Sequence, residues 1–186
     1  MTLLRWKFVL PIIGLALAIT AGRMVAQWSS GDEPADPLTA GFAAFSAERY
    51  SRAELLLEQA RTADPDNGEV YHGLALVALA RRGDTAAADA LFARSIALPD
   101  TSPVAFANYG RFLINEKRYA EAVDVLERGL ERDPDFDMAR ARLAIALYAE
   151  KRIEEACRMA RSVEDVPSAE SPLIDRIREE TACVTR

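Results

Sequence analysis

The sequence predicts an all-α protein built from stacked pairs of helices. Alanine, leucine and charged residues are abundant in its 186 residues, whereas aromatic residues make up only 8%. This composition favours helices over β-strands. Similar blocks of sequence also recur along the chain, and repetition at a fixed period is typical of folds that stack one structural unit on the next. Proline and glycine occur singly, where helices are expected to begin or end.

The clearest internal match joins residues 48–66 to residues 117–135. The two segments share a tyrosine, an alanine, a leucine and a proline at one constant offset: Tyr50 and Tyr119, Ala53 and Ala122, Leu57 and Leu126, Pro65 and Pro134. That offset is two periods of about 34 residues plus one, so a middle copy with one inserted residue is expected. Residues 71–98 supply it, and Arg81-Arg82 is the expected place of the insertion. A weaker fourth copy spans residues 143–156.

This helix–turn–helix unit resembles the tetratricopeptide repeat, and the resemblance covers residues 37–166. It implies three to four helical hairpins stacked as a solenoid. One alanine in each copy is expected where two helices cross most closely, with a large apolar residue one turn later on the same face. The alanines are Ala53, Ala88, Ala122 and Ala156, and the large residues are Leu57, Phe92 and Leu126.

Several residues predict where the helices begin and end. Asp36-Pro37 and Ser102-Pro103 have the pattern of an N-cap followed by an N1 proline. Residues 51–54 have the pattern of a capping box. Residues 167–186 are expected to form a capping helix for the exposed end of the stack. In that helix Ser171 would be the cap and Pro172 the first residue, and the apolar face would hold Leu173, Ile177 and Val184.

The N-terminus predicts a membrane anchor over residues 1–28, followed by a linker over residues 29–36. Arg5 and Lys7 precede an uncharged run from Phe8 to Gly22, and the apolar segment reaches Trp28 if Arg23 extends toward the membrane surface. The positive-inside rule then places the acidic body in the bacterial periplasm, with residues 8–28 crossing the inner membrane once. A cleaved signal peptide and a cytoplasmic protein are the alternatives.

Charge and residue usage argue against several functional classes. The net charge is −6, and no basic patch suited to nucleic acid stands out. The chain has one histidine and no paired-acid or glycine-rich motif, so we expect no catalysis, no metal, no cofactor and no small-molecule substrate. A protein or peptide partner is the expected ligand. The predicted function is therefore an interaction scaffold or assembly factor held at the inner membrane. A soluble periplasmic or secreted carrier with a cleaved signal is the alternative.

The resemblance also implies where a partner would bind, because the first helices of such repeats line a concave groove. The groove positions, by repeat, are Leu38, Phe42 and Phe45; His72, Leu76 and Leu79; Asn108, Arg111 and Asn115; and Arg142, Ile145 and Tyr148. The groove would be apolar at one end and polar and basic at the other. Such a groove suits an amphipathic helix or an extended segment with an apolar anchor.

The two cysteines, Cys157 and Cys183, lack the CxxC spacing of redox and zinc motifs. In an oxidising periplasm they would tend to form a disulfide that holds the last helix. The alternative is two unrelated buried thiols, because the sequence alone does not place them in contact.

Overall fold

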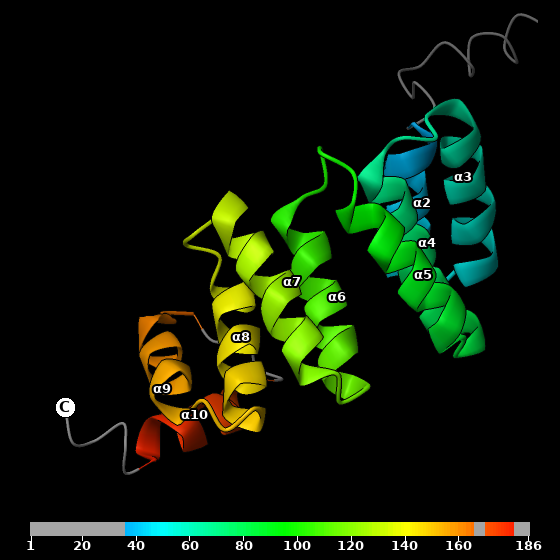
Figure 1. Cartoon of the computed structure of the whole chain (residues 1–186). Coiled ribbons are helices and arrows are strands. Elements are labelled where there is room, and N and C mark those ends of the chain that lie inside the picture. The colour runs from blue at the N-terminus through cyan, green and yellow to red at the C-terminus, as the bar shows by residue number, and fades with distance from the viewer. Residues whose placement is uncertain (1–35, 166–169, 181–186) are drawn as a thin grey trace, which may run out of the picture. The chain divides into compact units, whose positions relative to one another are not determined.

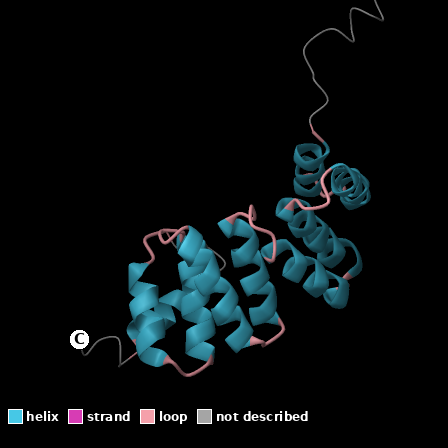
Figure 2. Cartoon of the chain, turned by 45° about the horizontal axis from the view of Figure 1, so that its top comes forward, coloured by secondary structure: helices cyan, strands magenta, loops and turns pink. Residues whose placement is uncertain are grey.

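The computed structural model describes residues 36–165 and 170–180. Within these ranges every regular element is an α-helix, and successive helices form pairs joined by short turns (Figures 1 and 2). The predicted repeat architecture is confirmed, with four pairs in the described residues. The pairs are α2 (Pro37–Ser46) with α3 (Tyr50–Ala63), α4 (Gly68–Arg82) with α5 (Thr85–Ile96), α6 (Pro103–Asn115) with α7 (Tyr119–Arg132), and α8 (Asp137–Ala149) with α9 (Ile153–Ser162).

Each turn within a pair contains a residue in the left-handed conformation. The φ angle is 57° at Glu48, 60° at Gly83, 62° at Lys117 and 65° at Lys151. Only the second turn uses glycine, the residue that adopts this conformation without steric cost. A left-handed residue is therefore common to the turns of all four hairpins.

The extra residue of the second repeat lies in the last turn of α4. There the amide of Asp84 donates to the carbonyl of Ala78, six residues back. In the third repeat the matching amide of Arg118 donates to the carbonyl of Leu113, only five residues back. The wider closure at Gly83 absorbs the inserted residue close to the predicted Arg81-Arg82 position.

Two predicted helix starts are wrong by one or two residues. Helix α3 begins at Tyr50 after an Arg49 cap, so Ser51 lies inside the first turn and residues 51–54 form no capping box. The left-handed turn at Glu48 reverses the chain so sharply that helical geometry starts almost immediately. At the C-terminus, α10 (Ser171–Glu179) is capped by Glu170, so Ser171 is not its cap.

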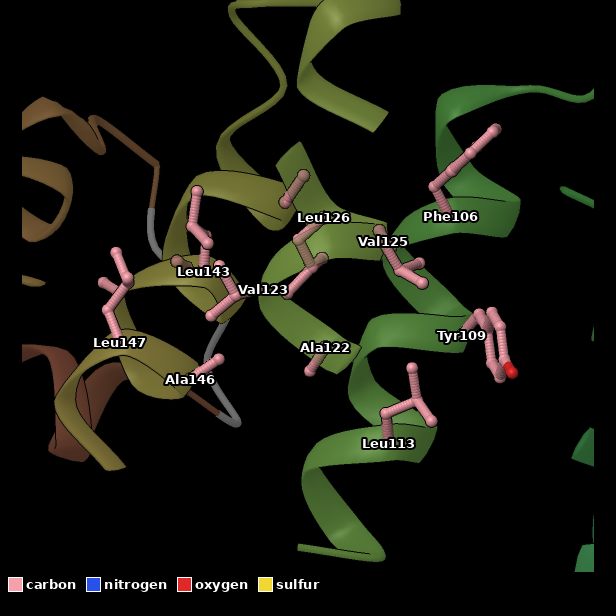
Figure 3. Close-up of a cluster of buried hydrophobic side chains, with 14 of the residues drawn as sticks. Phe106, Tyr109, Leu113, Ala122, Val123, Val125, Leu126, Leu143, Ala146 and Leu147 are labelled. Carbon is pink, nitrogen blue, oxygen red and sulfur yellow. The ribbon is translucent and has the colours of Figure 1, made fainter. Parts of the chain in front are cut away.

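The repeated alanines lie in the core, as predicted. Ala53, Ala88, Ala122 and Ala156 are all 0% exposed, and one turn later Leu57, Phe92 and Leu126 are at most 1% exposed. Figure 3 shows Ala122 and Leu126 on α7 among side chains from α6 and α8. The helices of a pair approach very closely, because a Cβ built on Gly110 of α6 would lie 2.5 Å from Leu126.

Helix α10 covers the last pair. It contacts both α8 and α9, as α8 itself contacts both helices of the preceding pair. It therefore takes the place that the first helix of a further repeat would have. Ile174 and Ile177 are its fully buried side chains, and the predicted contact Val184 lies outside the described residues.

No helix in the described part of the chain is long and apolar enough to span a membrane. The predicted anchor over residues 8–28 lies outside that part, as does the linker through residue 35.

A candidate partner-binding cleft

A cleft of about 130 Å³ opens between α4 and α6, the first helices of the second and third repeats. Five of the twelve predicted groove residues line it, namely Leu76, Leu79, Asn108, Arg111 and Asn115. They come from two repeats, so stacking of the repeats brings them together. The other lining residues are Thr85, Phe92, Phe112 and Glu116.

The two walls of the cleft differ in chemistry. Helix α4 contributes the half-buried side chains of Leu76 and Leu79, which are three residues apart and so share one face. Helix α6 contributes a polar stripe, with Asn108, Arg111 and Asn115 at successive turns.

The inner surface of the cleft is aromatic. The rings of Phe92 and Phe112 pack at 5.7 Å between centroids, and the two residues are 1% and 6% exposed. An amphipathic segment lying in the cleft would thus find apolar contacts on one side and hydrogen-bonding groups on the other.

A chain of polar side chains runs beside the cleft across three repeats. Glu69 and His72 belong to α4, Asn108 to α6, Arg142 to α8, and Glu170 precedes α10. His72 Nδ1 lies 3.2 Å from Glu69 Oε2, and His72 Nε2 lies 3.0 Å from Asn108 Nδ2. Arg142 donates to Asn108 Oδ1 at 3.3 Å and to Glu170 Oε1 at 3.0 Å. Buried polar groups of this kind are stable only when each has its partners.

The donors and acceptors in this row of hydrogen-bonded side chains indicate which ring nitrogen of His72 carries the proton. Arg142 can only donate, so Asn108 must turn its carbonyl oxygen toward Arg142 and its amide NH₂ toward His72. His72 Nε2 must then accept, which makes it the unprotonated nitrogen. In the neutral ring the proton lies on Nδ1, which donates to Glu69.

Burial disfavours the charged forms of Glu69 and Arg142, and their hydrogen-bond partners oppose this effect to different extents. Burial raises the pKa of the Glu69 carboxyl, but hydrogen bonds from His72 and Ser102 outweigh this effect and hold that pKa below its usual value. Burial lowers the pKa of the Arg142 guanidinium, the pairing with Glu170 opposes this shift, and the nearby charge of Arg111 adds to it. Arg111 and Arg142 are therefore two neighbouring cations beside the cleft.

Only Arg142 of these two cations has a carboxylate partner. Arg142 is 5% exposed and pairs with Glu170. Arg111 is exposed at the cleft, and no side chain among the described residues forms an ion pair or hydrogen bond with it. It is the cation that a bound molecule would reach.

The remaining predicted groove residues take other places. His72, at 3% exposure, and Arg142 are buried in the polar chain. Phe42 packs its ring 5.7 Å from that of His72. Leu38 and Phe45 pack against the core of the first two repeats, and Ile145 and Tyr148 against the larger core. The hydroxyl of Tyr148 also donates to Glu180.

Sequence reasoning missed six residues of this region, namely Thr85 and Glu116 of the cleft lining and the four residues that follow. Glu69 lies three residues before His72, a helical spacing that could have paired the two. Phe92 and Phe112 reach the cleft from the buried faces of α5 and α6, where their pattern indicates core alone. Glu170 meets Arg142 across 28 residues of chain, and no local pattern reports such a contact.

Cys157 lies on α9 at 2% exposure, and its sulfur is 3.8 Å from the carbonyl oxygen of Ile177 on α10. This places it at the contact between α9 and α10. Cys183 lies outside the described residues, so the pairing of the two cysteines stays a prediction.

Within residues 36–165 and 170–180, no group of three histidine, cysteine or acidic side chains is arranged to hold a metal ion. The cleft offers amide, guanidinium and apolar groups, which are suited to contacts with a polypeptide.

Models of the tetratricopeptide repeat match residues 38–103, 79–141 and 113–163. The solved structures similar to this chain include PilF of Pseudomonas aeruginosa, at 21% identity and a TM-score of 0.65, covering 80% of this chain and 70% of that one. MamA AMB-1 matches at 24% identity and a TM-score of 0.60, covering 79% of this chain and 83% of that one. YrrB, described as a TPR protein with an unusual peptide-binding site, matches at 17% identity and a TM-score of 0.60. That match covers 80% of this chain and 74% of the other. At these identities the likeness shows the fold alone.

Among curated proteins, the cytochrome c-type biogenesis protein CycH of Rhizobium meliloti is 27% identical over 179 residues. The match covers 93% of this chain and 44% of that relative, so the chain spans less than half the length of CycH.

Proposed function

Because the chain belongs to the tetratricopeptide-repeat family, we propose that it is a scaffold that binds a segment of a partner protein in the cleft between α4 and α6. Proteins of this family typically bind protein or peptide partners and typically lack catalytic activity. One observation carries the proposal: five residues expected to line a groove come together from two repeats around a single cleft with an apolar and a polar wall.

The similarity to CycH supports a more specific role. It extends over 93% of this chain, well beyond the repeats alone. We propose that the chain acts as an assembly factor in cytochrome c-type biogenesis, with a polypeptide of that process as the partner. The observation that favours this process is the relative's own assignment, since the fold is shared by proteins of many functions.

The proposed location is the inner membrane of a bacterium, with the repeats in the periplasm. Arg5 and Lys7 precede the uncharged run, and the 29 acidic residues of the chain all come after residue 28. This distribution fits a single span over residues 8–28. A soluble periplasmic or secreted carrier with a cleaved signal is the second candidate, favoured by the small-x-small sequence at residues 16–18.

Crosslinking and pull-down of the full chain from native membranes tests the proposal. A Leu79→Glu variant places a charge on the apolar wall of the cleft, and Leu55→Glu places the same charge on α3, where Leu55 is already 50% exposed. We expect Leu79→Glu to lose the crosslinked partner and Leu55→Glu to keep it, with both variants retaining the helical melting transition. Capture that is equal in the two variants would show that the partner does not bind in this cleft.

A further inference from the structure

We propose that the cleft selects a partner segment that carries one large apolar side chain beside a carboxylate, with the apolar group between α4 and α6 and the carboxylate on Arg111. This inference rests on the proposed function and names the chemistry of the partner. The partner segment is therefore acidic and apolar. It is not a basic segment, even though the net charge of −6 on the whole chain would by itself favour a basic partner.

The size of the cleft sets the apolar part of this selection. A volume of about 130 Å³ is close to that of a dry apolar cavity of roughly 150 Å³ that holds one benzene molecule. The cleft therefore has room for one leucine, methionine or phenylalanine side chain. Leu76 and Leu79 on α4, with Phe92 and Phe112 beneath, supply the apolar contacts. A single buried anchor of this kind commonly provides much of the binding energy of an interface.

Arg111 sets the charged part. It lines the cleft, it is exposed, and no described side chain neutralises it. The charge of Arg111 adds to that of the nearby buried Arg142, whose own carboxylate partner is Glu170. An incoming carboxylate can form two parallel hydrogen bonds with the free guanidinium, and such pairs are short and specific in geometry.

The other groups of the polar wall give the segment a direction. Glu116 caps the C-terminal end of α6 and lines the same cleft. It lies five residues after Arg111, about 7.5 Å along the helix axis, and it would repel a second carboxylate there. The acidic residue is therefore directed toward Arg111, and Asn108 and Asn115 on either side can bond the backbone of the segment.

Selection from a random phage-displayed peptide library on the full chain in detergent micelles tests this inference. We expect the enriched peptides to share an aspartate or glutamate at a fixed spacing from a leucine, methionine or phenylalanine. The enriched peptides are then synthesised with the acid changed to its amide, or to lysine, and titrated by fluorescence anisotropy. The proteins compared are the wild type, Arg111→Glu, Arg111→Lys and the control Arg52→Glu, which changes an exposed arginine on α3.

The amide peptide and the Arg111→Glu variant should each weaken binding roughly tenfold or more. Arg111→Glu should regain binding to the lysine peptide, Arg111→Lys should retain part of the affinity, and Arg52→Glu should behave as the wild type. Peptides whose binding needs Leu79 but tolerates Arg111→Glu would overturn the proposed preference for a carboxylate. The cleft would then remain the binding site of the proposed function. Failure to enrich any peptide, or enriched peptides that bind Leu79→Glu normally, would overturn both this inference and the proposed function.

Discussion

Asn108 is the residue on which the chain of polar side chains from Glu69 to Glu170 depends. It bonds His72 of the preceding repeat through its NH₂ group and Arg142 of the following repeat through its carbonyl oxygen. An isolated asparagine on α6 would be unremarkable, because a single repeat contains neither partner. The residue thus acquires its structural role only through stacking.

We predict that Asn108→Ala lowers the free energy of unfolding by about 1–3 kcal/mol, because it removes hydrogen-bond partners from two buried side chains. The matched control is Asn115→Ala on the same helix. Asn115 is exposed, and its replacement should change stability by less than about 0.5 kcal/mol. Urea unfolding followed by circular dichroism measures both. Equal midpoints for the two variants would mean that the chain of hydrogen bonds contributes nothing measurable.

The three central residues of this row of polar side chains were predicted from the sequence, but Glu69 and Glu170 at its two ends were not. Asn108 and Arg142 lie one 34-residue period apart and so occupy matching positions, whereas His72 lies 36 residues before Asn108 and is one position away from the matching one. The resemblance to the repeat family placed all three residues in the groove. Their burial was not predictable, since it depends on how closely neighbouring repeats stack. Glu170 was out of reach because it follows a connection that belongs to no repeat.

At the scale of helices, the alanine of each second helix marks the closest contact within a pair. We predict that Ala122→Glu abolishes cooperative folding, because it forces an unpaired carboxylate and extra volume into a site that is 0% exposed. The cost is several kcal/mol, comparable with the whole stability of a small domain.

Ala120→Glu is the control for this prediction. It makes the same substitution two residues earlier on α7, at an exposed position, and should leave the melting temperature nearly unchanged. Thermal unfolding of the two variants side by side separates a core effect from a general effect of added charge. A cooperative melt of Ala122→Glu at the wild-type temperature would contradict the packing derived from the repeat register.

The boundaries of the helices were less predictable than their existence. Alanine and leucine spacing predicted each pair, because burying one face of a helix fixes that spacing. The starts of α3, α7 and α9 follow arginines, Arg49, Arg118 and Arg152, rather than the usual capping residues. Their position is set by the left-handed residue before them, and a lysine or glutamate there gives no signal in the sequence.

The C-terminal helix should be the first element to open. We predict that Cys157 and Cys183 form a disulfide that holds α10 on α8 and α9, closing a loop of about 25 residues and stabilising the fold by roughly 3 kcal/mol on the chain-entropy model. Reduction should then increase amide exchange in α10 before the earlier helices respond, because α8 and α9 are the helices of the described part that contact it.

Thiol labelling of denatured protein taken directly from cells measures the pairing, and hydrogen exchange with and without reductant measures its effect. A Cys183→Ser variant should reproduce the reduced state without reductant. Two labelled cysteines per chain would contradict the disulfide.

For the molecule as a whole, the decisive question is which compartment holds the repeats, because the partner must be in the same one. We predict a single span over residues 8–28 with residues 37–186 in the periplasm, since the cations of residues 1–28 favour the cytoplasmic side at the N-terminus. Added protease should digest the repeats in spheroplasts and spare them in intact cells, with a known periplasmic protein as the positive control. The undigested protein should stay with the membrane pellet after a carbonate wash.

Release from the membrane together with a mature N-terminus inside residues 1–28 would instead establish the cleaved, soluble carrier. Repeats that survive while the periplasmic control is cut would place them in the cytoplasm, where both thiols would remain reduced.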